Sequence, residues 1–148
     1  MRRTFRMGGM RRAGNLLLSA LIRTGLAPKR NFLLVTRGRR SGLERVTPVA
    51  LVLDAETRWL VAPYGPVSWV HNARAAGSVT LRRRGYSQDF AVEEVDAREA
   101  APILKRYVKM YPIVLPYFDA RRGSSVEDFA AEAARHPVFR LRPKNSAT

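Results

Sequence analysis

The sequence has no cysteine, and only two histidines are available for catalysis or metal binding. Without thiols the chain forms no disulfide, no thiolate nucleophile and no cysteine-ligated metal site. Long apolar runs are also missing: the best, residues 16–22, falls far short of the ~18 residues of a membrane-spanning helix. Because Arg23, Lys29 and Arg30 follow that run without a cleavage site of small residues, we expect no secretory signal and a cytoplasmic protein.

Acidic residues are scarce in the first third of the chain. Residues 1–45 contain twelve arginines and lysines but only one acid, Glu44, whereas the rest of the chain is nearly balanced. Most of the formal net charge of +15 therefore lies at the N-terminal end. Such asymmetry favours an anionic partner: nucleic acid, a lipid head-group surface or a phosphorylated ligand. An arginine-rich proteome is the alternative explanation for the first few residues.

The constellations of hydrolytic enzymes are absent as well. His136 precedes a proline, and His71 has no second histidine or carboxylate at catalytic or metal-binding spacing. No serine is coupled to a histidine and an acid, so we expect His71 to be a surface residue and expect no metal site. If the protein is an enzyme, a bound cofactor has to supply the chemistry.

Hydrophobic periodicity divides the chain into a basic segment, residues 1–28, and a domain, residues 29–148. The basic segment contains a predicted amphipathic helix over 15–25, with Asn15 as N-cap and Gly25 as its closing glycine. In the domain, strands are predicted over residues 31–37, 45–54, 58–62, 78–83, 86–95 and 138–142. Helices are predicted over 69–76 with Ser68 as cap, 97–110 with Pro102 in its first turn, and 125–135 with Ser124 or Ser125 as cap.

Tight turns between the first five strands favour an antiparallel meander. Six strands in a chain of this size most economically close into a small barrel, which removes exposed edges. The sequence therefore predicts a mostly β (α+β) fold: a six-stranded, largely antiparallel split barrel with short flanking helices and an N-terminal helix.

The densest group of arginines lies in TRGRRSGLERVTP, residues 36–48, between two predicted strands. The planar guanidinium group of arginine can donate two parallel hydrogen bonds to phosphate oxygens. Gly38 and Gly42 let a ligand approach the backbone closely. Ser41 adds a hydroxyl and a backbone N–H. The spacing is not that of a P-loop, and no helix follows. Composition alone leaves both a solvated loop and an anion-binding site open.

A second concentration of functional residue types is PYGPVSWVHN, residues 63–72. Tyr64 and Trp69 suit a ligand wall at a helix N-terminus, although a core position suits Trp69 equally. Further along, Tyr107, Tyr111 and Tyr117 surround the prolines of YVKMYPIVLPYF, and residues 111–123 suit an aromatic loop that covers a pocket. Core packing suits Tyr107 at least as well.

Together, LLVTRGRRSGLERVTPV, WLVAPYG and WVHNARAAGSVTL resemble the deazaflavin-dependent nitroreductase family, small split β-barrels that bind coenzyme F420. The similarity extends from Phe32 to Leu81, and a weaker similarity is present in residues 110–112 and the last predicted strand. It implies a reductase that transfers a hydride from the reduced coenzyme to a quinone, enone, nitro or other unsaturated acceptor. The compact PYGPVSW departs from members that carry a lysine at the position of Tyr64, so their substrates do not transfer to this chain.

The resemblance implies a two-part site. It assigns coenzyme binding to Arg39, Arg40, Ser41, Arg45, Thr47, Pro48, Ala62, Pro63, Tyr64 and Asn72. It assigns the substrate side to Trp69 and Tyr111, with Tyr111 or solvent as the proton donor.

Two alternative functions also fit the sequence: a split barrel that binds FMN or haem, and a non-catalytic carrier of a lipid, a quinone or the coenzyme. A nucleic-acid-binding module would present arginines on a recognition helix, whereas the helices predicted over 97–110 and 125–135 are mixed in charge or acidic. We therefore expect no nucleic-acid partner. Residues 1–25 suit peripheral contact with an anionic membrane at its inner face, and docking of that helix on the domain suits them as well. Both a monomer and a homodimer fit.

Overall fold

The structure is a computed structural model that describes residues 9–24 and 30–144, with the α1 side chains described over residues 15–22. The strands are β1 (Asn31–Arg37), β2 (Glu44–Asp54), β3 (Thr57–Val61), β4 (Ser78–Arg83), β5 (Tyr86–Glu94) and β6 (Val138–Pro143). The helices are α1 (Gly9–Thr24), α2 (Ser68–Ala76), α3 (Ala97–Met110) and α4 (Val126–Glu132), with short 3-10 helices η1 (Pro112–Tyr117) and η2 (Ala133–Arg135). The predicted strands are confirmed to within a residue or two at each end.

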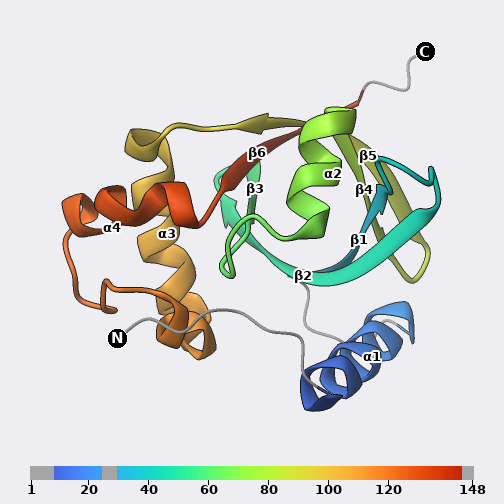
Figure 1. Cartoon of the computed structure of the whole chain (residues 1–148), viewed down its shortest axis with the longest axis horizontal. Helices are drawn as coiled ribbons and strands as arrows, with labels where there is room; N and C mark the ends of the chain where they lie inside the picture. Colours follow the sequence, from blue (N-terminus) through green and yellow to red (C-terminus); the bar gives the residue numbers. More distant parts are fainter. Residues whose placement is uncertain (1–8, 25–29, 145–148) are drawn as a thin grey trace.

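The six strands form a closed barrel in the order β1-β2-β3-β6-β5-β4, and every pair is antiparallel (Figure 1). The predicted barrel is confirmed, but the five-strand meander is wrong. β3 pairs with β6, and β4 pairs with β1. The reason is that β3 and β4 are joined through α2, and a connection of that length carries the chain away from its neighbour, unlike a hairpin turn.

Two large hydrophobic clusters stabilise the fold. The first fills the barrel and includes Leu34, Leu60 and Phe90 from the strands together with Trp69 and Val70 from α2. In Figure 1, α2 lies across the barrel as this packing requires. The second cluster lies outside the barrel, where α3, η1 and α4 cover β3 and β6. α3 and η1 thereby face β2 across a corner of the molecule, where the candidate site lies.

A third, smaller cluster attaches α1 to the barrel wall. Ile22 is fully buried against Leu33 of β1, with Leu18 and Leu21 packed beside it. On the other side of the same helix, Leu16 and Leu17 are 72% and 64% exposed. None of the described helices is long and apolar enough to cross a bilayer.

Several helix boundaries differ from the sequence predictions. α1 begins at Gly9, so Asn15 lies inside the helix and is not its N-cap, while Gly25 lies outside the described residues. The N-cap of α2 is Val67 and no side chain caps it, so Ser68 is the first helical residue. Gly77 closes α2 as predicted, with φ 72° in the left-handed region.

The C-terminal helices follow the sequence more closely. α3 has the predicted bounds, and the Asp96 carboxylate caps it by accepting the Glu99 N–H at 3.0 Å. Pro102 is the sixth residue of α3, beyond the first turn that we predicted. Ser125 caps α4 in a capping box with Asp128, but α4 is shorter than predicted because η2 follows it. The predicted aromatic loop contains η1, so it is partly helical.

Candidate functional site

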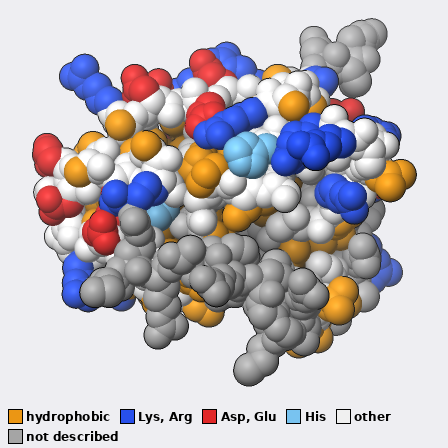
Figure 2. All heavy atoms as spheres, in the orientation of Figure 1, with side chains coloured by type: hydrophobic (Ala, Val, Ile, Leu, Met, Phe, Trp, Pro, Cys, Tyr) orange, Lys and Arg blue, Asp and Glu red, His pale blue; other side chains and the backbone are white. Residues whose placement is uncertain are grey.

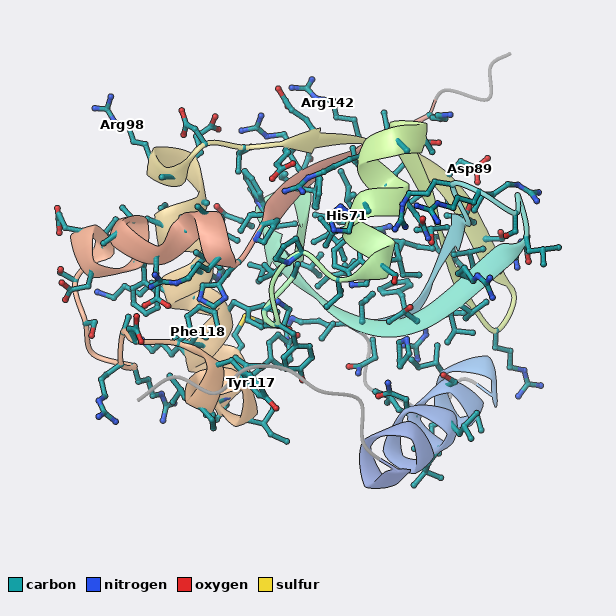
Figure 3. The ribbon with its side chains drawn as sticks, in the orientation of Figure 1. His71, Asp89, Arg98, Tyr117, Phe118 and Arg142 are labelled. Atoms are coloured by element: carbon teal, nitrogen blue, oxygen red, sulfur yellow. The ribbon has the colours of Figure 1, made fainter. Side chains whose placement is uncertain are left out.

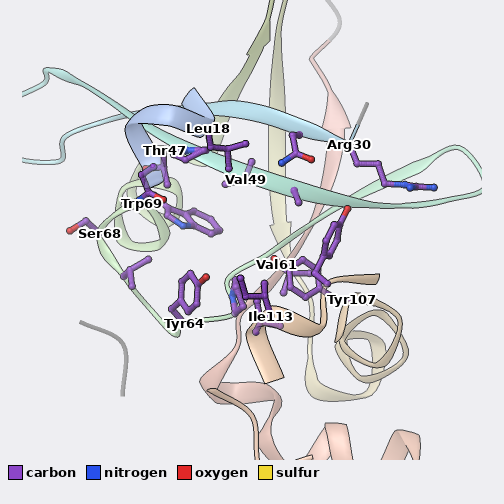
Figure 4. A pocket seen from close by; sticks show the side chains of 18 residues that line it. Leu18, Arg30, Thr47, Val49, Val61, Tyr64, Ser68, Trp69, Tyr107 and Ile113 are labelled. Carbon is purple, nitrogen blue, oxygen red and sulfur yellow. The ribbon is translucent and has the colours of Figure 1, made fainter. Parts of the chain in front are cut away.

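A pocket of about 820 Å³ lies between α1, β2, the β3–α2 loop and the α3–η1 corner (Figure 4). This volume is typical of small-molecule sites, which measure roughly 300–1,000 Å³. Six of the residues predicted for the site line it: Thr47, Pro48, Pro63, Tyr64, Trp69 and Tyr111. The other six do not line it: Arg39, Arg40, Ser41, Arg45, Ala62 and Asn72.

Aromatic rings form two walls of this pocket. Tyr64 packs edge-on against Tyr117 of η1 with ring centroids 4.8 Å apart, and Tyr107 packs against Tyr111 at 4.9 Å. Trp69 is only 7% exposed and packs on Phe139 inside the barrel, yet it also lines the pocket. Both interpretations of Trp69 therefore hold, because one side of the indole contacts the core and another part faces the pocket.

Tyr111 places its phenol between the pocket and β2. Its O–H donates to the Leu51 carbonyl oxygen at 3.0 Å. Burial raises the pKa of Tyr111, and the nearby guanidinium of Arg30 lowers it by less. The phenol is therefore neutral near physiological pH and keeps a proton to donate.

The arginine-rich turn is tightly built from its own hydrogen bonds. Gly38 N–H donates to the Leu43 carbonyl oxygen at 2.8 Å, and Ser41 Oγ accepts the Leu43 N–H at 3.2 Å. A Cβ on Gly38 would lie 2.7 Å from Ser41 Oγ, so only glycine fits there without displacement. Gly42 has φ 72°, in the left-handed region that favours glycine. The Ser41 hydroxyl is thus already engaged in holding the turn.

Asn72 fastens this turn to α2. Its Oδ1 accepts the Arg39 backbone N–H at 3.3 Å and an Arg39 guanidinium N–H at 2.8 Å. Its Nδ2 donates to Thr36 Oγ1 at 3.3 Å, and both Asn72 and Thr36 are 3% exposed. Asn72 therefore connects the turn, β1 and α2 from a buried position, and its polar atoms contact protein groups on both sides.

The positive charge of the turn is largely uncompensated. Among the described residues, neither Arg40 nor Arg45 forms an ion pair or a side-chain hydrogen bond. The Glu44 carboxylate does not pair with Arg40 or Arg45, because it accepts a hydrogen bond from Arg82 at 3.1 Å, which lowers the pKa of Glu44. Figure 2 shows Lys and Arg side chains gathered on the face of the molecule that carries α2. Because Arg45 lies two residues before Thr47 on β2, this charge adjoins the pocket.

A buried polar cluster behind the pocket wall was missed in the sequence. His136 Nδ1 donates to the Pro63 carbonyl oxygen at 2.9 Å, and its Nε2 lies 2.8 Å from Glu132 Oε1. Both side chains are 2% exposed, and the imidazole stacks on Phe118 with centroids 3.7 Å apart. The i, i+4 spacing of the two residues was the available signal. In contrast, His71 is exposed on α2 as predicted (Figure 3).

Glu132 is also the acceptor for the loop after η1. Its carboxylate accepts the backbone N–H groups of Asp119 at 3.1 Å and Ala120 at 2.6 Å. Burial raises the pKa of Glu132, but the hydrogen bonds from Ala120, His136 and Asp119 outweigh it, and the net pKa is lowered. The carboxylate therefore stays charged and ties three segments together behind Pro63.

A second group that sequence reasoning missed lines the pocket from the N-terminal side. Asn15 and Leu18 come from α1, Arg30 immediately precedes β1, and Asn31 begins it. Their distance in sequence from the two motifs gave no signal that they would share a cavity.

Comparison with known proteins decides the family. The family model described as F420H(2)-dependent quinone reductase matches residues 17–123. The chain belongs to this family. Its members are coenzyme F420-dependent reductases, so the protein is an oxidoreductase of that kind. No curated protein matches the chain.

Solved structures agree with this quinone reductase family in fold. One titled F420-H2 Dependent Reductase (FDR-A) is 22% identical with a TM-score of 0.55, covering 77% of this chain and 95% of its own. Another, titled as a domain-swapped dimer, is 21% identical with a TM-score of 0.56, covering 90% and 96%. HutZ, the haem storage protein from Vibrio cholerae, is 11% identical with a TM-score of 0.54, covering 80% and 84%. At these identities the likeness concerns the split-barrel fold.

The residues present fit the coenzyme that the quinone reductase family uses. A deazaflavin is flat and aromatic, and the pocket between Trp69, Tyr64 and Tyr111 has mostly apolar and aromatic walls. The coenzyme also carries phosphate and acidic groups, and Arg40 and Arg45 offer cations with no acidic partner in the described part of the chain. Shape and charge are thus complementary in two adjoining places.

Proposed function

We propose that the protein reduces a lipophilic quinone, enone, nitro or other unsaturated compound, which binds in the apolar part of the pocket. The observation that carries this proposal is the adjacency of an apolar, aromatic-walled cavity to an unpaired cationic turn. Coenzyme F420 would supply a two-electron hydride donor. A non-catalytic carrier of a lipid or a quinone would not need that redox group, whereas a carrier of the coenzyme would bind it without turnover of an acceptor.

The residues of the chain would act through binding and orientation. Arg39, Arg40 and Arg45 would hold the acidic tail, and Asn72 would position Arg39 from behind. Thr47, Pro48, Ala62, Pro63 and Tyr64 would contact the coenzyme along β2 and the β3–α2 loop. The Trp69 indole would border the acceptor and exclude water. Holding two reactants in one geometry removes much of the entropic barrier to transfer.

The direct test is a titration of the protein with oxidised and reduced coenzyme, followed by turnover of a panel of quinones, enones and nitro compounds. We expect saturable binding of the coenzyme and oxidation of its reduced form that depends on at least one of these acceptors. Binding without turnover of any acceptor would contradict the proposal and favour a carrier. A tightly bound yellow flavin in the purified protein would favour FMN.

Changing Tyr111 to phenylalanine is expected to lower turnover about 100-fold or more, if its phenol protonates the reduced acceptor. Coenzyme affinity should change less than twofold, because the ring remains. Since burial raises the pKa of Tyr111 above its ordinary value of 10.0, its contribution should be constant between about pH 6 and pH 9. Steady-state kinetics over that range measures it. Unchanged turnover in Tyr111→Phe would make solvent the proton donor.

We propose further that α1 contacts anionic membranes through its exposed leucines. Leu16 and Leu17 face away from the barrel while Ile22 packs on Leu33, so one helix has an apolar side in contact with the domain and another in solvent. Replacing Leu16 and Leu17 with serine should reduce sedimentation with phosphatidylglycerol vesicles several-fold. Turnover of a water-soluble acceptor should be unaffected. Equal vesicle binding by the variant and the unmodified protein would refute the contact.

A further inference from the structure

Among the described residues that line the pocket, Arg30 is the one with a charged side chain. The remaining described lining residues are apolar, aromatic or neutral polar, and no carboxylate is among them. Arg30 immediately precedes β1 and Asn31 begins it; Figure 4 shows the Arg30 side chain at one end of the cavity, with its guanidinium directed outward from the lining rings. This end of the cavity therefore offers donors for an anion, and the described lining residues include no carboxylate that would repel one.

This end of the cavity is separate from the arginine-rich turn. Asn31 pairs with Ala50 of β2, whereas Thr36 pairs with Arg45 at the other end of the same two strands. Five residues along β1 correspond to about 17 Å at roughly 3.3 Å per residue. Pro48 and Val49 line the pocket between these ends. The site thus has two cationic ends with an apolar stretch between them.

Arg30 also differs from many other arginines of the molecule in its surroundings. Arg82, Arg106 and Arg140 each contact a carboxylate. Within residues 9–24 and 30–144, no carboxylate lies within ion-pair distance of the Arg30 guanidinium. Its positive charge nevertheless reaches into the pocket, since it lowers the pKa of Tyr111 against the larger effect of burial.

We infer that Arg30, assisted by the Asn31 amide, binds a carboxylate or similar acidic group on the hydride acceptor. The preferred substrates are then apolar unsaturated molecules with one anionic end. This inference rests on the proposed function and narrows its substrate class. Arg30 is exposed, so it pays little desolvation on pairing, and a guanidinium binds a carboxylate through two parallel N–H groups.

The test uses two acceptors with the same ring: a 1,4-naphthoquinone with a carboxylate-terminated side chain, and its methyl ester. In the unmodified protein the acid should have the lower KM. Arg30→Ala should reduce kcat/KM for the acid about 10-fold or more, mainly through KM, and change the ester less than twofold. Arg30→Lys should retain part of the preference, and Arg30→Glu should reverse it in favour of the ester.

A binding measurement without coenzyme separates recognition from turnover. Quenching of tryptophan fluorescence by each quinone reports occupancy of the pocket, because Trp69 lines it. We expect Arg30→Ala to weaken binding of the acid alone, and the difference to shrink at high salt. Equal losses for acid and ester in kcat would instead mean that Arg30 stabilises charge formed during reduction, which overturns the inference.

The inference and the proposed function fail in different ways. If the unmodified protein turns over neither quinone with the reduced coenzyme, these quinones are not acceptors, and the proposed function then depends on the enones and nitro compounds of the panel. The fluorescence titration still decides whether Arg30 binds the carboxylate. If both quinones are turned over with no effect of Arg30→Ala on the acid, only the inference is overturned.

Discussion

Replacing Arg39, Arg40 and Arg45 together with alanine is expected to weaken coenzyme binding at least 100-fold. Hydrogen bonds to charged groups contribute roughly 1.5–3 kcal/mol each, so the loss of two or three such contacts accounts for this factor. The turn itself should persist, because Gly38, Gly42 and Ser41 hold it through backbone and hydroxyl hydrogen bonds. All three arginines are exposed, so the barrel should stay folded.

The measurement is a fluorescence titration in a Trp59→Phe background. Trp59 and Trp69 are the two tryptophans, and only Trp69 lines the pocket. Trp59 is buried, and its Nε1 has no hydrogen-bond partner among the described residues, so phenylalanine removes an unsatisfied donor there. The remaining signal then belongs to the site.

A matched control separates local recognition from loss of overall charge. Arg98, Arg121 and Arg122 are exposed on α3 and on the loop before α4, and their replacement with alanine removes the same net charge. In Figure 3, Arg98 lies at the far end of the molecule from α2. This control should bind the coenzyme nearly as well as the unmodified protein. Equal loss in both triple variants would mean that the turn is not the binding site.

Glu132→Ala is expected to reduce the free energy of unfolding by about 3–5 kcal/mol. The change removes the acceptor for His136 and for the backbone N–H groups of Asp119 and Ala120, all in a buried setting. That loss is a large part of the 5–15 kcal/mol by which domains are typically stable. Urea unfolding followed by circular dichroism measures it.

The exposed ion pair between Arg135 and Asp119 provides the contrast. Both side chains are about half exposed, so Asp119→Ala should cost no more than about 1 kcal/mol. The Asp119 backbone N–H that donates to Glu132 is retained in this variant. A loss as large as that of Glu132→Ala would show that the loop, and not the buried carboxylate, carries the stability.

Glu132 also predicts a dependence of stability on acid. Because its pKa in the folded protein is below the ordinary value of 4.5, its contribution is complete above that value and is lost as pH falls through the lower, folded pKa. Glu132→Gln cannot titrate. The difference in unfolding free energy between Glu132→Gln and the unmodified protein should therefore shrink below pH 4.5, and a constant difference would contradict the assignment.

Local patterns were sufficient for most of the secondary structure. The β-branched residues of β2, the alternating pattern of β5 and the apolar spacing of α3 are short-range signals that the structure confirms. The sequence narrowed the cap of α4 to Ser124 or Ser125, and the structure places it at Ser125, in a capping box of four consecutive residues. The meander failed at β3 because strand pairing depends on the path of the connection, and β6 lies far along the chain from β3.

The candidate site likewise has parts that local sequence patterns predicted and parts that only tertiary packing sets. The arginine turn and the Pro63–Trp69 loop were each recognisable as continuous stretches whose residue types suit an anion and an aromatic ring. Asn72 was assigned to the coenzyme, but the structure shows its polar atoms on Arg39 and Thr36, which lie more than 30 residues away. Side-chain partners of this kind follow from how α2 packs across the barrel.

The sequence by itself determined the charge asymmetry, the strands and the family likeness, because each depends on residues that are neighbours in the chain. Only the tertiary structure decided which residues share the pocket and what supports its wall. Barrel closure brings the start of β1 beside Tyr111 and seats His136 against Pro63, across separations of about 80 and 73 residues. Such contacts are set by the packing of whole elements, and no local pattern encodes them.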